Sequence, residues 1–156
     1  MIKLKFTTRI VVAEQYERLP LKIIRLIAYI QLLKGDGLFT ERFEAIVDTG
    51  AHTSVIPKRL WETLQCKIQA ENVWLSGIND RPECRISASI GEVTGMIIDD
   101  DNHHTEALNF TAFLVSTDRV PLILGISGIL DKYHLSWDYQ NQNAYLKKKR
   151  RRPTGV

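Results

Sequence analysis

The sequence predicts an all-β fold built mostly from antiparallel strands, with one short helix near its C-terminal end. Apolar runs rich in Ile, Val and Leu alternate with turns that contain Gly or Asn, a pattern typical of successive β-hairpins. The clearest turn is Lys34-Gly35-Asp36-Gly37. Because the apolar residues 21–33 carry no helix caps and end at this turn, we expect a strand there and a hairpin with residues 42–48.

The first twenty residues contain two β-like segments, 2–6 and 10–13, and a charged stretch that ends at Pro20. We expect residues 1–20 at the periphery, as an N-terminal extension of the domain formed by residues 21–146. A chain of 156 residues has the length of one ordinary domain with its own core.

After the first hairpin, residues 57–65 predict a short helix, because Pro57 suits a first helical turn and apolar residues share one side. A second hairpin follows, and Gly91 fits a bulge in its returning strand. The remaining elements are expected in this order: the hairpin tip at 76–80, its returning strand at 84–90 and 92–98, strands at 107–115 and 121–124, a short helix at 126–133, and a last hairpin of 135–139 and 144–146.

The composition is that of a soluble globular protein. Cys66 and Cys84 are too few and too far apart for a disulfide framework, and neither belongs to a zinc-type Cys-x-x-Cys pair. We therefore expect reduced thiols and a cytoplasmic location. Residues 21–33, the most apolar segment, are shorter than the roughly 20 residues of a membrane-spanning helix, so no transmembrane segment is expected.

Residues 147–156 are expected to form a basic, flexible tail. Six consecutive basic residues begin at Lys147 and end at Arg152, and they exceed the net charge of +3, so the rest of the chain is mildly acidic. The tail fits a solvated terminus, a phosphate-binding arm or a nuclear address. Because no aromatic residues are interleaved with the charges, we favour the solvated terminus over nucleic-acid binding.

Asp48 is the candidate for chemistry. It follows the β-forming residues Ala45-Ile46-Val47 and precedes a turn, so its carboxylate emerges from buried backbone. An Asp in such a turn can also simply bond its own backbone. The other polar residues do not point to chemistry. His52 is expected to be an ordinary loop histidine. His103 and His104, beside three Asp, are expected to lie in a solvated loop that binds no metal.

Three segments, in the same order, resemble parts of the retropepsin-like, retroviral-type aspartic proteases. They match the active-site loop, the tip of the flap, and the hydrophobic pair and Gly before the C-terminal helix of that family. These segments are Asp48-Thr49-Gly50-Ala51, Ser76-Gly77-Ile78-Asn79 and Ile123-Leu124-Gly125.

The resemblance implies a closed, mostly antiparallel domain that acts as an aspartic endopeptidase on extended peptides, without a cofactor. Asp48, Thr49 and Gly50 would be catalytic, and Ala51 with the second and third segments would bind substrate. Since each chain has one Asp-Thr-Gly, the partner would be a second copy, and the two Asp48 carboxylates would share a proton and activate a water. Thr49 would bond to the partner's loop, and Gly125 would let its strand pack beneath the active-site loop.

Two alternatives stay open. A catalytically silent domain could keep this fold for peptide binding or dimerisation, since the hairpin tip at residues 76–80 contains a single Gly. A weaker alternative is an RNA-associated protein that uses the basic tail. Serine hydrolysis is disfavoured, because Gly125-Ile126-Ser127-Gly128 lacks the spacing of a nucleophile elbow.

Overall fold

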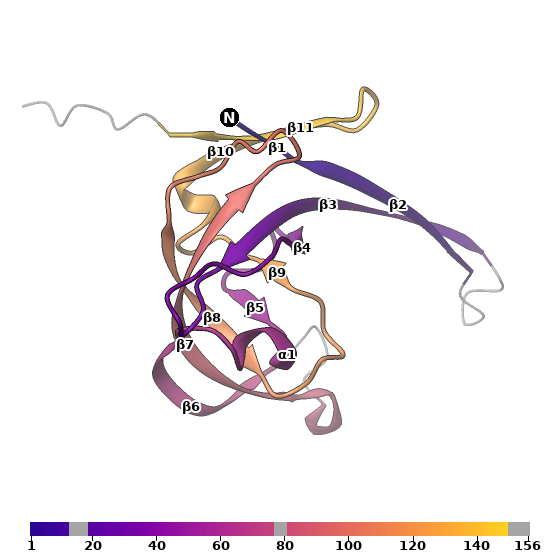
Figure 1. Cartoon of the computed structure of the whole chain (residues 1–156). Helices are drawn as coiled ribbons and strands as arrows, with labels where there is room; N and C mark the ends of the chain where they lie inside the picture. The colour runs from indigo at the N-terminus through magenta and orange to yellow at the C-terminus, as the bar shows by residue number, and fades with distance from the viewer. Residues whose placement is uncertain (13–18, 77–80, 150–156) are drawn as a thin grey trace, which may run out of the picture.

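The computed structural model describes residues 1–12, 19–76 and 81–149. Within these residues the chain is mostly β and forms two sheets, one in the order β2-β3-β4-β9-β5-β8-β7-β6 and one in the order β1-β11-β10 (Figure 1). The strands are β1 (Ile2–Lys3), β2 (Lys5–Val12), β3 (Pro20–Leu32), β4 (Phe43–Val47), β5 (Ser54–Ile56), β6 (Lys67–Leu75), β7 (Ile86–Ile98), β8 (Leu108–Val115), β9 (Ile123–Leu124), β10 (Tyr133–Asp138) and β11 (Asn143–Lys148). The all-β prediction is confirmed.

The strands β3 and β4 form the first hairpin, as the turn at residues 34–37 predicts. They pair antiparallel over residues 27–30 of β3. The other edge of the same part of β3 pairs with β7, over residues 29–32. Because β3 has a neighbour on both edges here, the larger sheet closes on itself as a barrel.

The first half of β3, residues 20–26, leaves the barrel and pairs only with β2 among the described strands, from Phe6↔Leu26 to Val12↔Pro20. We call this two-stranded ribbon, residues 5–12 and 20–26, the arm. It projects from the body of the molecule, toward the right of Figure 1. The sequence predicted strands in this region but not that they pair with each other.

The N-terminal strand is an integral part of the fold, which corrects the expectation that residues 1–20 are peripheral. Ile2 and Leu4 are buried in the main core, and β1 pairs antiparallel with β11. Alternation places the side chains of residues 2 and 4 on one face, and that face turns inward. Of the described residues in this range, those of the arm match the expected peripheral position. At the other end of the chain, Lys147 and Lys148 belong to β11, so the expected flexible tail does not begin at residue 147.

Most of the buried side chains form one cluster, which joins residues of the barrel strands to residues of the three-stranded sheet. Its fully buried members come from strands far apart in the sequence, such as Ile30 of β3, Ile56 of β5, Leu114 of β8 and Leu124 of β9. Two parallel pairs, β4 with β9 and β5 with β8, run through the centre. These central strands carry the loops described below.

The helices are shorter than predicted. The helix expected at 57–65 is a single turn, α1 (Lys58–Trp61), and the one expected at 126–133 is a 3₁₀ turn, η3 (Leu130–Lys132). Gly128 has a φ of +78°, and residue 128 therefore interrupts any helix across this segment. A further 3₁₀ turn, η2 (Pro82–Cys84), precedes β7.

The bulge expected at Gly91 lies in the neighbouring strand instead. β7 runs without interruption through Gly91, and the register shifts occur in β6, between Ile68 and Val73. A Cβ at position 91 would lie 2.7 Å from Leu114 Cδ1, so the absence of a side chain serves packing against β8.

Of the helices in the described part of the chain, none has both the length and the apolar character needed to cross a membrane.

Candidate active site

Asp48 stands at the end of β4, where central strands hold its backbone. The Ile46 N–H donates to the Leu122 carbonyl over 2.9 Å, and the Asp48 N–H donates to the Leu124 carbonyl over 3.0 Å. Val47 before it is buried, whereas Asp48 is half-buried. The sheet therefore fixes the backbone of the acid and leaves its side chain accessible.

The Asp48 carboxylate is oriented by its own loop. The Gly50 N–H donates to Asp48 Oδ1 over 2.8 Å, and the Ala51 N–H donates to the Asp48 carbonyl over 3.3 Å. A Cβ at position 50 would lie 3.2 Å from the same Oδ1, so Gly50 leaves room for this approach. An ordinary Asp turn makes the same bond, so this bond alone does not distinguish an active-site loop from a surface turn.

A second segment, residues 125–127, clamps the loop. The Ile126 N–H donates to the Ala51 carbonyl and the Ser127 N–H to the His52 carbonyl, each over 2.9 Å. The Gly125 N–H donates to Ser54 Oγ over 3.0 Å, and Ser54 is fully buried. Four bonds from β9 and this segment therefore immobilise the loop that presents Asp48.

Gly125 makes this clamp possible. A Cβ at position 125 would lie 2.7 Å from the Thr53 carbonyl carbon and 2.8 Å from the Ala51 carbonyl oxygen. Only a residue without a side chain lets the two backbones come this close. The expectation that Gly125 allows its strand to pack beneath the loop is confirmed.

The structure brings two of the three predicted segments together. The loop at 48–51 lies against the segment at 123–125, in which Leu124 is fully buried and supports the loop from the core. Ile123 is half-buried in a separate apolar cluster. Ser76 is exposed at the end of the described part of the hairpin, and Gly77, Ile78 and Asn79 lie outside the described residues.

That separate cluster packs the β6–β7 hairpin against β5, β8 and β9. Its buried members come from β5, β7 and β8, and half-buried residues of β6 and β9 pack against them. Sequence reasoning missed most of these positions, because each is one apolar residue in an ordinary strand. The cluster consists of Val55, Ala88 and Val115, with Val73, Leu75, Ile86, Phe113, Val120 and Ile123 around them.

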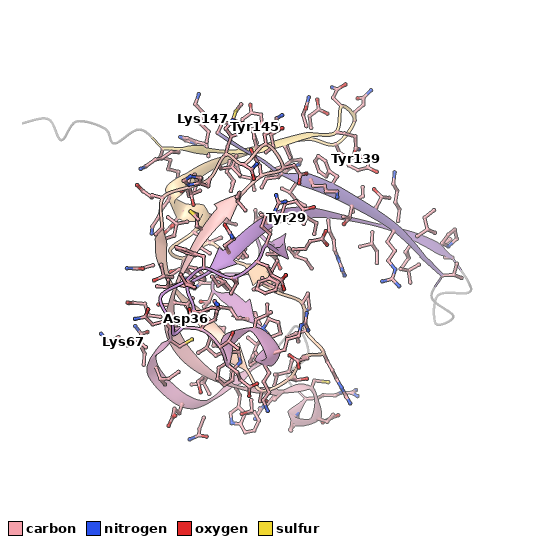
Figure 2. All side chains as sticks on the ribbon, viewed as in Figure 1. Tyr29, Asp36, Lys67, Tyr139, Tyr145 and Lys147 are labelled. Carbon is pink, nitrogen blue, oxygen red and sulfur yellow. The ribbon has the colours of Figure 1, made fainter. Side chains whose placement is uncertain are left out.

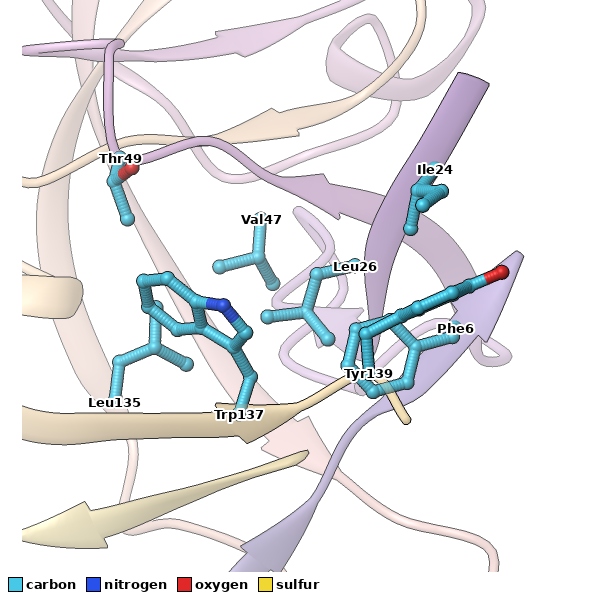
Figure 3. A pocket seen from close by; sticks show the side chains of 8 residues that line it. All are labelled: Phe6, Ile24, Leu26, Val47, Thr49, Leu135, Trp137 and Tyr139. Carbon is cyan, nitrogen blue, oxygen red and sulfur yellow. The ribbon is translucent and has the colours of Figure 1, made fainter. Parts of the chain in front are cut away.

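Thr49 faces a second apolar region, on the side of the arm. Thr49 and Val47 line a surface pocket of about 350 Å³ (Figure 3). The rest of its wall comes from the base of the arm and from β10 and the turn after it, and consists of Phe6, Ile24, Leu26, Leu135, Trp137 and Tyr139. No local sequence pattern predicts this region, because it brings together segments from both ends of the chain.

The acidic loop after β7 is a structural anchor. Asp99 is 1% exposed, and its carboxylate accepts hydrogen bonds from the backbone N–H groups of Lys3, Asp101 and His103, over 2.8 to 3.1 Å. Burial acts to raise its pKa, but the Lys3 and His103 N–H groups and the His103 side chain outweigh this effect, so the Asp99 pKa lies below its usual range.

The same loop holds ligand atoms at metal-binding distances. One atom each from Asp99, Asp101 and His103 lies within 4.8 Å of the others. Backbone N–H groups already occupy the Asp99 oxygens, and Asp101 pairs with Lys3 Nζ over 2.6 Å. These bonds tie β1 to the end of β7, which accounts for the cluster without a metal.

Comparison with known proteins identifies the family. No curated protein matches the chain significantly. The model of the retroviral aspartyl protease family matches residues 20–133, well over half of the chain, from the first residue of β3 to the first residue of β10. The match contains both the Asp48 loop and the segment that clamps it. The chain belongs to the retroviral aspartyl protease family.

Proposed function

We propose that the protein is an aspartic endopeptidase that works as a homodimer, with one Asp48 from each chain at the two-fold axis. The observation that carries the proposal is the clamped loop, in which residues 125–127 and Leu124 hold the backbone on either side of Asp48. Such rigidity is what catalytic positioning requires and what a plain surface turn lacks. Proteins of this family are typically dimeric.

Two facing carboxylates supply both the base and the acid that peptide hydrolysis needs. Like charges about 3 Å apart resist being ionised together, so the pair holds one proton. The ionised Asp48 takes a proton from water while the protonated Asp48 of the partner subunit donates to the peptide carbonyl oxygen. The Gly50 N–H donates to Oδ1 of its own Asp48 and so holds this carboxylate in one orientation.

The substrate lies extended between the Asp48 loop and the β6–β7 hairpin, and it pairs with the hairpin as an added strand. The apolar cluster that packs this hairpin against β5 and β9 includes Val55, Val120 and Ile123. We therefore expect apolar residues on either side of the cleaved bond. The free thiols of Cys66 and Cys84 support a reducing compartment, and we place the activity in the cytoplasm.

Cleavage profiling tests the proposal. Wild type and Asp48→Asn are incubated at equal, high concentration with a denatured-proteome peptide library from pH 4 to 7, and the products are identified by mass spectrometry. Asn keeps the shape of the side chain but cannot act as the base. Cuts at apolar sites with wild type, and none with Asp48→Asn, are expected.

The control for this experiment is the oligomeric state of both preparations, measured by analytical ultracentrifugation. If the wild type is dimeric but makes no cuts, the proposed protease activity is wrong, and a catalytically silent peptide-binding domain of the same fold becomes the better interpretation. If wild type and Asp48→Asn make the same cuts, these cuts come from a contaminating protease, and the dimer has no demonstrated activity.

A further inference from the structure

The arm has one apolar face. Cross-strand register places Phe6 opposite Leu26, Thr8 opposite Ile24, and Val12 opposite Pro20, and alternation puts these pairs and the Ile10–Lys22 pair on one face. Ile10 is 69% exposed, Val12 58% and Ile24 42%. At about 3.3 Å per residue, the eight residues of β2 carry this face over about 26 Å.

The opposite face of the arm is more polar and basic. It carries Lys5, Thr7, Arg9 and Arg25 between the apolar residues Val11, Leu21, Ile23 and Ile27. Positive charges spread in this way suit contact with water. The two faces of one ribbon therefore differ in what they can bury.

The base of the arm is held in its projecting position by Tyr139, at the end of β10 (Figure 2). The Tyr139 hydroxyl lies 3.0 Å from Thr8 Oγ1, and its ring makes an edge-to-face contact with Phe6 at 5.4 Å between centroids. Lys22 Nζ lies 4.8 Å from the centre of the same ring. A two-stranded ribbon with an exposed apolar face is only marginally stable in water, so a cover for this face is expected.

The apolar face continues into the pocket beside the catalytic loop. Phe6, Ile24 and Leu26 line this pocket together with Val47 and Thr49 (Figure 3). Trp137, which completes the wall, is 59% exposed. Thr49 directly follows Asp48, so whatever brings a second carboxylate to Asp48 must also approach this face.

A second copy of the chain fits this surface by its charge as well as by its position. On the described part of the apolar face Lys22 is the residue that carries a charge, and its ammonium group is placed over the Tyr139 ring. Two such faces can therefore meet with little repulsion between like charges. A two-fold contact of this kind buries the same patch on both copies.

We propose that the apolar face of the arm belongs to the dimer interface, so that each arm lies across the other protomer and thereby brings the two Asp48 loops together. The inference rests on the proposed function, because that function requires a second Asp48. It adds to the function a named element, the β2–β3 arm, whose first strand lies outside the residues that the family model matches.

Neighbouring isoleucines on opposite faces give a matched test. In Ile24→Lys a charge enters the apolar face, and in Ile23→Lys the same charge enters the other face of the same strand. The dissociation constant of the dimer is measured by sedimentation equilibrium. Since each copy loses one buried isoleucine, we expect Ile24→Lys to weaken the dimer about hundredfold and Ile23→Lys by less than about threefold.

A second pair, Ile10→Lys and Val11→Lys, repeats the comparison on β2, and thermal unfolding of the dilute monomers shows that all four variants are folded. Equal weakening by both members of each pair would overturn the assignment of the face. A wild type that remains monomeric at about 100 μM would overturn the inference together with the dimeric mechanism.

The inference and the proposed function fail in different ways. If the arm variants dimerise like wild type while Asp48-dependent cleavage persists, the arm is not at the interface and the protease stands. If dimerisation depends on the apolar face but no peptide is cleaved, the inference stands and the proposed activity is wrong. A vesicle or peptide that binds the face of a monomeric wild type would identify a different occupant and overturn the inference.

Discussion

Asp99 shows how a single buried carboxylate links the first strand to the barrel. It accepts the backbone N–H of Lys3 from β1 and those of Asp101 and His103 from its own loop. Hydrogen bonds to an ionised group are stronger than those between neutral groups, so these bonds stabilise β1 in place. The N-terminal strand is thus fixed by an acid almost a hundred residues away in the sequence.

Because the Asp99 pKa is depressed in the folded protein, its contribution to stability has a defined pH dependence. The contribution is fully present above the unfolded pKa of about 4 and is lost as pH falls through the lower folded pKa. We expect Asp99→Asn to lower the free energy of unfolding by about 1–3 kcal/mol at pH 7. The difference from wild type should shrink toward pH 3, as measured by urea denaturation at both pH values.

The exposed neighbour supplies the control for that measurement. Asp101 pairs with Lys3 at the surface, where ion pairs contribute little. Asp101→Asn should therefore change stability slightly and without the same trend in pH. A loss for Asp99→Asn that is equal at pH 3 and pH 7 would assign its role to shape rather than to charge.

At the scale of the element, the contact between the Asp48 loop and residues 125–127 depends on Gly125. In Gly125→Ala a Cβ would press on the backbone of Ala51 and Thr53, and neither can move without shifting the loop. We expect a loss of about 1–3 kcal/mol in the free energy of unfolding and at least a tenfold loss of cleavage rate. Urea denaturation and a peptide assay measure the two effects.

Gly35 offers the matched substitution. A Cβ at position 35 would meet nothing within 4 Å, and its φ does not lie in the left-handed region. Gly35→Ala should therefore leave both stability and cleavage near the wild-type values. If Gly125→Ala behaved in the same way, the loop would tolerate displacement and rigidity would not explain its role.

The same contact explains which elements the sequence could predict. β4, its turn and Gly125 follow from local signals, namely an apolar run, a Gly-containing turn and a Gly at a strand end. The helix expected at 126–133 is reduced to the 3₁₀ turn η3, because the N–H groups of Ile126 and Ser127 bond to a loop more than seventy residues away. A distant competitor of this kind leaves no trace in local periodicity.

The arm and the pocket beside Thr49 escaped prediction for a related reason. β2 and β3 pair across residues 13–19, which contain no Gly-based turn signal. The pocket joins Phe6 of β2 to Trp137 of β10, so neither end of the chain predicts it alone. The part of the candidate site that one continuous segment forms, the Asp48 loop, was therefore predictable. The pocket beside it was not, because its residues come from segments near both termini.

For the whole molecule, the proposed mechanism requires that each chain supply one half of a catalytic pair. If both Asp48 residues are required and chains exchange freely, mixed dimers of wild type and Asp48→Asn are inactive. Activity per wild-type chain then equals the wild-type fraction, so an equal amount of Asp48→Asn halves it and a fourfold excess leaves about one fifth. Unchanged activity at every ratio would mean that each chain acts alone and would contradict the shared pair.

A double variant separates this dilution effect from nonspecific inhibition. Asp48→Asn combined with Ile24→Lys retains the inactive loop, but its arm carries a charge on the apolar face. Since one altered arm is expected to weaken a mixed dimer about tenfold, a fourfold excess of the double variant should inhibit wild-type activity much less than the same excess of Asp48→Asn in the same peptide assay. Inhibition as strong as that by Asp48→Asn alone would show that mixed dimers form without the arm, and the interface would then have to be placed on another face of the barrel.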